Sequence, residues 1–179
     1  MMRIVLEGLD GTGKSTIGQM LAPMLGGIYY ATPPPQYRAA RELIDVAATD
    51  IQHYWFYVDA VRAASAELAK LDAPHVIIDR YWMTTVAYHR AVGVNADLDD
   101  FGPILQPDVT IFFDASLDVL TERKNKRGWT AGDRRMADRE GRIREAYTAL
   151  LATTPSAWMI RTDLYSPEEA VAVIITRIR

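Results

Sequence analysis

Gly8-Leu9-Asp10-Gly11-Thr12-Gly13-Lys14-Ser15 spells the pattern G-x-x-x-x-G-K-S, and the apolar run from Ile4 to Glu7 comes directly before it. The glycines allow the backbone to curl so that successive N–H groups point at phosphate oxygens. The helical run from Thr16 to Leu25 follows, and the positive end of its dipole favours bound phosphate. The sequence therefore predicts a strand, a phosphate-binding loop and a helix that begins at Lys14.

In this type of loop, each residue has an expected role toward a nucleoside triphosphate. Lys14 reaches the β- and γ-phosphates, and the Ser15 hydroxyl is expected to bind Mg²⁺. A glycine turn with a purely structural role is the alternative, but the strand before the loop and the helix after it favour phosphate binding. The residues expected to bind the triphosphate are Gly8, Asp10, Gly11, Thr12, Gly13, Lys14, Ser15 and Thr16.

The composition indicates a single soluble domain over residues 1–179, with 49% apolar and 24% charged residues. A net charge of -3 argues against a general nucleic-acid binder. The chain has no cysteine, and His53, His75 and His89 show no metal-ligand spacing, so we expect no structural metal. Without a signal-like segment or an apolar run of membrane-spanning length, we expect a cytoplasmic protein with no membrane contact.

Strands and helices alternate along the chain. Apolar, β-rich runs predict strands at 4–7, 27–31, 75–79, 109–114 and 158–161. A helix is predicted from the spacing of Tyr54, Val58, Val61, Ser65, Leu68 and Leu71, and another from the capping box that opens at Ser166. The pattern predicts a three-layer α/β fold with a parallel sheet of about five strands covered by helices on both faces.

Ligands of such sheets bind beyond the carboxyl ends of the strands, which draws attention to Asp79-Arg80-Tyr81. Asp79 closes a predicted strand and is a candidate ligand for Mg²⁺. Arg80 offers a planar fork suited to a second phosphate. A helix cap with a surface partner is the alternative reading of this pair.

Three segments resemble the thymidylate kinase family, and with later stretches the resemblance covers nearly the whole chain. They are the glutamate-led loop at 7–16, the Asp-Arg-Tyr segment with a tyrosine eight positions after its arginine, and Pro107 to Asp114. The later stretches at 123–128 and 142–147 are similar to the family as well. The resemblance implies phosphoryl transfer from ATP to a nucleoside monophosphate, with dTMP the family substrate, and it allows a homodimer.

The resemblance also implies roles for single residues. Arg80 resembles the arginine that binds the acceptor phosphate, and Tyr88 the tyrosine that packs against the sugar. Asp10 resembles a carboxylate near the acceptor sugar and the metal, and Arg123 an arginine that stacks on adenine. The residues expected to contact the acceptor are Asp10, Pro34, Tyr37, Arg38, Phe56, Asp59, Arg80, Thr84, Thr85 and Tyr88.

The segment at about 124–138 has the composition of a mobile lid over ATP, because glycines flank its centre and arginines populate both ends. A solvated charged face is the alternative. The phosphate loop carries no arginine, so the chain resembles the type of thymidylate kinase that supplies a catalytic arginine from the lid. Lys14, Asp10 and Arg80 are accordingly joined as catalytic candidates by Arg127, Arg134 and Arg135.

Three departures from the family leave the acceptor open. The loop at 31–38 is short and rich in proline, and the family's Asp-Arg pair appears as Asp59-Ala60, with Arg62 displaced by two positions. The segment after the lid reads Asp133-Arg134-Arg135-Met136 in place of Asp-Arg-x-Glu. Alternatives are therefore a kinase of another or modified pyrimidine deoxynucleotide, a kinase of a non-nucleotide metabolite, and a regulatory nucleotide-binding domain without activity.

Overall fold

The computed structural model describes residues 1–178, and its centre is a five-stranded sheet in the order β2-β3-β1-β4-β5. All four pairs of neighbouring strands are parallel. This confirms the predicted three-layer α/β fold. The strands are β1 (Met2–Gly8), β2 (Ile28–Ala31), β3 (His75–Asp79), β4 (Val109–Asp114) and β5 (Ala157–Arg161).

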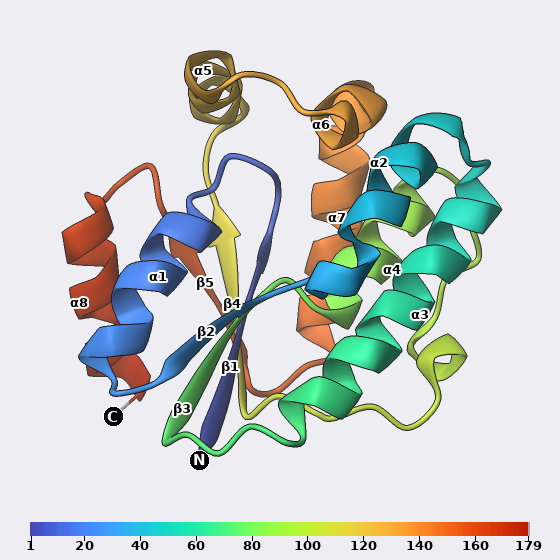
Figure 1. The fold of residues 1–179 in the computed structure, drawn as a ribbon. Coiled ribbons are helices and arrows are strands. Elements are labelled where there is room, and N and C mark those ends of the chain that lie inside the picture. Colours follow the sequence, from blue (N-terminus) through green and yellow to red (C-terminus); the bar gives the residue numbers. More distant parts are fainter. Residues whose placement is uncertain (179) are drawn as a thin grey trace.

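Helices cover both faces of the sheet (Figure 1). Helices α1 and α8 lie on one face, and α3, α4 and α7 lie on the other. The helices are α1 (Lys14–Met24), α2 (Arg38–Ala47), α3 (Asp50–Leu68), α4 (Trp82–Ala91), α5 (Leu117–Arg127), α6 (Ala131–Met136), α7 (Glu140–Ala152) and α8 (Pro167–Ile178).

Two apolar cores, one on each face, hold the layers together. Ile4 and Leu6 of β1 point into the core beneath α1 and α8, whereas Val5 between them points into the core beneath α3, α4 and α7. This alternation follows from the two-residue period of a strand that is buried on both faces. The sheet is therefore rigid at its centre, where β1 delivers the phosphate loop.

Local sequence signals set most of the element boundaries. Ser166 and Glu169 form the predicted reciprocal cap at the start of α8, with donor–acceptor distances of 2.8 and 3.2 Å. A second box caps α3 through Thr49 and Gln52. Helix α1 ends one residue after Pro23, as expected of a proline near a helix end.

The apolar face of α3 packs inward. Val58, Val61 and Leu68 are each at most 3% exposed because they face the core of their own chain. This apolar face is therefore accounted for by packing within the chain. Among residues 1–178, no helix is both long and apolar enough to span a bilayer.

The carboxyl ends of the strands meet at one edge of the sheet, and α5 and α6 lie above this edge (Figure 1). The phosphate loop, the residues after β3 and the segment after β5 all emerge there. This edge is where the predicted site residues can come together.

Candidate active site

The loop between β1 and α1 wraps around the ammonium group of Lys14. Lys14 Nζ donates to the carbonyl oxygens of Gly8 at 3.0 Å and Leu9 at 2.6 Å, and to Thr12 Oγ1 at 3.1 Å. Gly8 has a φ of 138°, and a Cβ there would lie 2.2 Å from the carbonyl oxygen of Phe113 on β4. Only glycine fits this position, so the first glycine of the motif seats the loop against the sheet.

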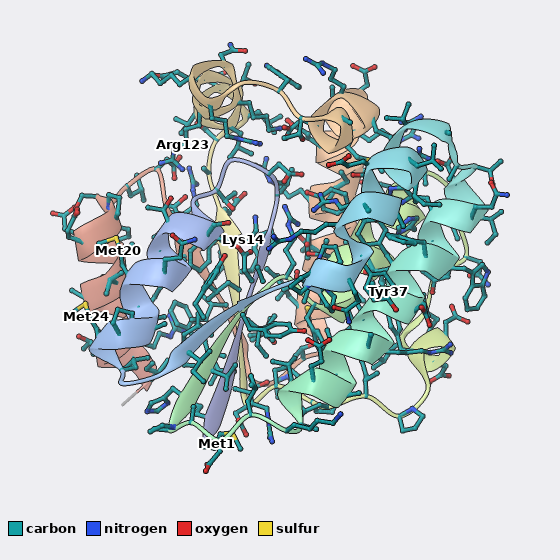
Figure 2. All side chains as sticks on the ribbon, in the orientation of Figure 1. Met1, Lys14, Met20, Met24, Tyr37 and Arg123 are labelled. Atoms are coloured by element: carbon teal, nitrogen blue, oxygen red, sulfur yellow. The ribbon has the colours of Figure 1, made fainter. Side chains whose placement is uncertain are left out.

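Burial changes the acidity of Lys14, which is 5% exposed. Desolvation and the nearby Arg80 guanidinium lower its pKa to about 7, although Asp10 and Asp79 act in the opposite direction. An anion that binds beside this buried ammonium group stabilises its charged form strongly. The loop is therefore chemically suited to a polyphosphate, as the motif predicts. In Figure 2 the label of Lys14 lies beside the upper end of the strands, close to α1.

Ser15 and Asp79 lie together at the ends of α1 and β3. Ser15 Oγ donates to Asp79 Oδ2 at 2.5 Å, and the Tyr29 hydroxyl donates to the same oxygen at 2.6 Å. A hydroxyl beside a carboxylate suits Mg²⁺, which needs only one or two protein ligands when phosphates supply the others. The predicted metal residues Ser15 and Asp79 therefore fit the ion.

Asp10 of the phosphate loop forms hydrogen bonds with Arg80 and Tyr88, which lie on the other side of the cavity. Its Oδ1 accepts from Arg80 Nη2 at 2.7 Å, and its Oδ2 accepts from the Tyr88 hydroxyl at 2.8 Å. Burial alone would raise the pKa of Asp10, but the charges of Arg80 and Lys14 hold it well below its usual range. Asp10 is thus an anion fixed between two cations, and both of its oxygens are engaged.

Arg80 is held in a backbone conformation that is uncommon for a residue with a side chain. Its φ is 68°, whereas the other positive φ values among residues 1–178 belong to glycines. The Arg80 side chain donates from Nη1 to the Gly8 carbonyl and to Thr84 Oγ1, both at 3.1 Å. Such local strain is found at sites where the position of a side chain matters.

Below Arg80, the buried carboxylate of Glu7 ties three elements together. It accepts hydrogen bonds from the Tyr81 amide at 3.0 Å, the Thr84 hydroxyl at 2.5 Å and the Tyr147 hydroxyl at 3.1 Å. Burial raises the pKa of Glu7, while these donors and the Arg80 charge oppose the shift. Thr84, which was expected to contact the acceptor, thus links Glu7 to Arg80.

A cavity of about 680 Å³ joins the phosphate loop to α3 and α4. Most residues predicted for the triphosphate and several predicted for the acceptor lie in its wall. They are Asp10, Gly11, Thr12, Gly13, Lys14, Ser15, Thr16, Asp79, Arg80, Thr84, Thr85, Tyr88, Arg123, Arg127 and Arg135.

Five residues predicted to contact the acceptor lie outside this wall. Tyr37 donates to Asp59 at 2.6 Å, and its ring packs edge-on against Phe56 at 5.5 Å, so these three side chains hold one another. Arg38 is exposed, and Pro34 is buried away from the cavity. Helix α2 turns Arg41, one turn after Arg38, toward the cavity instead.

The sequence did not reveal a further group of polar residues that line the cavity from α2, α3 and α4. Arg41 and Asp45 come from α2, His53 and Tyr57 from α3, and His89 from α4. Each lies one turn from another member of the group or from a predicted residue, so helical spacing was the available signal. It did not reveal them because their contacts join different helices.

The lid arginines differ in placement. Arg127 donates to both oxygens of the buried Asp133 at 2.8 and 3.0 Å, and Arg135 donates to Asp50 at 2.7 Å. Both line the cavity, whereas Arg134 is exposed and does not. Lys124 and Glu140 form a further ion pair that joins α5 to α7.

Arg123 lies in the wall of the cavity on the side next to α8. Its guanidinium donates to the carbonyl oxygens of Gly11 at 3.2 Å and Thr162 at 2.9 Å. Figure 2 labels it beneath α5, near the loop that follows β5. The residue predicted for adenine therefore lies beside the phosphate loop.

Comparison with known proteins agrees with this geometry. A sequence model of the family described as thymidylate kinase matches residues 6–174. The chain belongs to the thymidylate kinase family. It is 30% identical to a thymidylate kinase of Akkermansia muciniphila, covering 97% of this chain and 89% of that one. It is 26% identical to a thymidylate kinase of Roseiflexus sp., covering 96% and 92%.

Solved structures show the same fold. The thymidylate kinase of Candida albicans superposes with a TM-score of 0.85 at 18% identity, covering 99% of this chain and 90% of that one. A deoxyadenosine kinase of M. mycoides superposes with a TM-score of 0.73 at 18% identity, covering 99% and 98%. Membership of the thymidylate kinase family makes this chain a nucleoside monophosphate kinase, a phosphotransferase that uses ATP.

Within the thymidylate kinase family, this chain departs at position 60. Ala60 lines the cavity where the resemblance led us to expect an arginine. Arg62 does not take its place, because it donates to the carbonyl oxygens of Phe101 at 3.1 Å and Asp100 at 2.7 Å. Arg41 of α2 lines the same cavity as Ala60.

Proposed function

We propose that this chain transfers the γ-phosphoryl group of ATP to dTMP and forms dTDP and ADP. The observation that carries the proposal is the meeting of Lys14 and Arg80 around Asp10 in one cavity. One cation belongs to a triphosphate loop, and the other extends from the end of β3 to face it. A donor phosphate and an acceptor phosphate can thus be held on either side of Asp10.

On the donor side, the amides of Gly11 to Lys14 surround the phosphates, and Lys14 exchanges its carbonyl contacts for phosphate oxygens. Arg123 lies against the adenine. Ser15 and Asp79 would hold Mg²⁺, which neutralises charge on the phosphate oxygens when bound. Asp10 is a less suitable metal ligand, because both of its oxygens already accept from Arg80 and Tyr88.

On the acceptor side, Arg80 and Arg41 bind the monophosphate, and Tyr88 with Thr85 contacts the nucleoside. Arg41 takes the role expected for Arg38, because it lines the cavity and Arg38 does not. Asp10 orients Arg80 and the acceptor sugar. No general base is required, since a phosphate monoester is largely ionised at neutral pH.

The transfer step then depends on position and charge. A non-bridging oxygen of the dTMP phosphate attacks the γ-phosphorus in line, and the bond from that phosphorus to the β,γ-bridging oxygen breaks. Arg127 and Arg135 of the lid face the cavity and supply the positive charge that the transferring group needs. Arg134 is the weakest of the three catalytic candidates.

The experiment that tests this function mixes the protein with ATP, Mg²⁺ and single monophosphates, namely dTMP, dUMP, dCMP and dAMP. We expect dTDP to form fastest, detected by mass. A protein that binds ATP but phosphorylates none of the four would overturn the proposal. Omission of Mg²⁺, with EDTA present, should abolish turnover.

We also propose that residues 1–179 act as one domain in the cytoplasm and associate as a homodimer. The exposed apolar side chains of Leu43, Val46, Ile51 and Trp55 on α2 and α3 support the dimer, with exposures of 47–73%. Light scattering after size exclusion gives the mass in solution. A monomer at micromolar concentration would contradict the dimer.

A further inference from the structure

Helix α2 depends on polar contacts for its orientation. None of its residues from Arg38 to Ala47 is buried, so apolar packing does little to fix the direction in which Arg41 points. The contacts that tie α2 to the rest of the molecule pass mainly through Asp45, one turn after Arg41. Asp45 also lines the acceptor end of the cavity.

The Asp45 carboxylate accepts three hydrogen bonds. Its Oδ2 accepts from Arg41 Nε at 3.1 Å. Its Oδ1 accepts from the Tyr57 hydroxyl at 2.9 Å and lies 3.2 Å from His53 Nε2. Hydrogen bonding from His53 and the charge of Arg41 lower the pKa of Asp45 although burial opposes the change, so this carboxyl is ionised.

His53 in turn contacts His89 of α4. His53 Nδ1 lies 2.7 Å from His89 Nε2, and His89 Nδ1 lies 2.6 Å from the carbonyl oxygen of Thr85. A carbonyl only accepts, so His89 Nδ1 carries a proton. Burial lowers the pKa of His89 to about 4, so its Nε2 is a bare acceptor at neutral pH.

Both ring nitrogens of His53 are therefore engaged, Nδ1 with His89 and Nε2 with the ionised Asp45. The two histidines are nearly buried, at 7% and 2% exposure.

Arg41 is left with a free fork. Asp45 occupies its Nε, and within residues 1–178 neither terminal amino group has a hydrogen-bond partner. By contrast, the terminal amino groups of Arg80 already donate to Gly8, Thr84, Asp10 and Tyr88. Arg41 can thus take a phosphate bidentately without giving up a contact.

We propose that His53 and His89 position Arg41 for the acceptor phosphate through the Asp45 carboxylate. This inference rests on the proposed function of the cavity. The contacts run from the Thr85 carbonyl oxygen through the two imidazoles to the Asp45 carboxylate, and from there to the Arg41 guanidinium. They fix α2 on α3 and α4, and so present the Arg41 fork at a set angle. His53 is a positioning residue that does not touch substrate.

Other charged or titratable groups face this series of hydrogen bonds from the neighbouring elements. Arg135 of the lid donates to the main-chain oxygen of Asp45 at 3.3 Å and to Asp50 at 2.7 Å. The charge of Arg135 adds to the lowering of the His89 pKa by burial, whereas the charge of Asp50 opposes it. The rings of Tyr54 and Tyr57 pack against His89 and His53 at 5.1 and 4.8 Å. The lid residue Arg135 therefore lies next to the residues proposed to position Arg41.

Steady-state kinetics of His53→Gln and Asp45→Asn test the proposal, with ATP and dTMP varied separately. We expect the KM for dTMP to rise about tenfold in each variant, the size of one charge-assisted hydrogen bond, while the KM for ATP and kcat change less than twofold. His75→Gln, a histidine at the opposite end of the sheet, is the matched control and should leave all constants unchanged. Unchanged KM for dTMP in His53→Gln overturns the proposal.

A double-mutant cycle separates positioning from general loss of structure. If His53 acts through Arg41, the double variant Arg41→Ala with His53→Gln binds dTMP no more weakly than Arg41→Ala alone. Fully additive losses overturn the proposal. Should His53→Gln not fold, Asp45→Asn takes its place in the cycle.

Nitrogen NMR of the wild-type imidazoles gives an independent readout. We expect His89 to show one protonated nitrogen, Nδ1, and one bare nitrogen, Nε2, at pH 7. A doubly protonated His89 contradicts its acceptance from His53, whatever the kinetics. If the wild type phosphorylates no monophosphate, the proposed function and this inference are both overturned. If the wild type turns over dTMP normally but the losses in Arg41→Ala and His53→Gln are additive, only this inference is overturned.

Discussion

Nη2 of Arg80 donates to Oδ1 of Asp10 at 2.7 Å, and this ion pair joins the end of β3 to the phosphate loop. The two residues are seventy positions apart in sequence, and each follows its own strand at the same edge of the sheet. Donor and acceptor sides of the reaction thus share one charge pair.

Replacement of Arg80 by alanine should damage the acceptor side selectively. We expect kcat/KM for dTMP to fall by a factor of about 10² to 10³, the usual cost of one charged donor to a reacting group, with ATP affinity retained. Arg80→Lys should recover only part of the loss, because lysine lacks the planar fork. Steady-state kinetics and ATP titration give both quantities. An equal loss of ATP affinity would contradict the separation of roles.

Lys14 should make ATP binding dependent on pH. Its pKa of about 7 is low for a lysine, and the phosphates of ATP will raise it, so binding takes up a proton wherever the free protein has lost one. The affinity for ATP should therefore fall as the pH rises from 7 to 9. At pH 8 the uptake should approach about one proton.

Calorimetry of ATP binding in buffers with different ionisation enthalpies measures this proton directly. Lys14→Arg serves as the control, because arginine stays protonated and should show no uptake. Proton release, or uptake that persists in Lys14→Arg, would show that another group is responsible.

The lid arginines should differ in their effect on turnover. Arg127 and Arg135 line the cavity, so replacement of either by alanine should lower kcat by a factor of about 10² or more. Arg134 is exposed outside the cavity, so Arg134→Ala should change kcat less than about twofold.

Arg127 also neutralises the buried Asp133, so its loss can destabilise the protein. The thermal unfolding of Arg127→Ala must therefore be measured together with its kinetics. Arg127→Lys should restore stability better than turnover. A large kcat loss in Arg134→Ala with native stability would reverse the assignment.

The buried carboxylate of Glu7 makes Tyr147 important for stability. Tyr147→Phe removes one of the three donors to Glu7 and leaves an acceptor site unmet, so we expect a loss of about 1–3 kcal/mol in the free energy of unfolding. Urea unfolding measures it. Tyr165→Phe, at an exposed tyrosine, should change stability by less than about 0.5 kcal/mol. Equal effects of the two changes would remove the special role of Glu7.

The parts that could be predicted from sequence are those fixed by local chemistry. Gly8 has no space for a side chain, Ser166 caps its own helix, and Asp79 with Arg80 follows directly from a strand end. The choice of Arg41 over Arg38 was not predictable. It depends on how α2 is rotated against α3, and that rotation is set by contacts of Asp45 with His53 and Tyr57 from another helix.

The same limit applies to the meeting of His53 with His89. The residues are thirty-six positions apart, and only the packing of α3 on α4 brings their rings to 4.9 Å. Each histidine alone reads as an isolated polar residue on a buried helix face. Their coupling is a property of the tertiary structure, and it leads to the last prediction.

His89 should make the protein sensitive to mild acid. Burial lowers its pKa from 6.5 to about 4, so between these values the unfolded chain binds more protons at this residue than the folded one. Its contribution to stability is present in full above pH 6.5 and is lost as the pH falls toward 4. The shift corresponds to about 3 kcal/mol at most.

Urea unfolding of wild type and His89→Gln between pH 4 and 8 tests this. The wild-type free energy of unfolding should decline through the window, and His89→Gln should start lower at pH 8 but decline less steeply. His75→Gln should follow the wild-type slope, because His75 lies at the other end of the sheet. If His89→Gln keeps the full wild-type slope, the acid sensitivity arises elsewhere, and a neutral His89 in the chain to Asp45 loses its support.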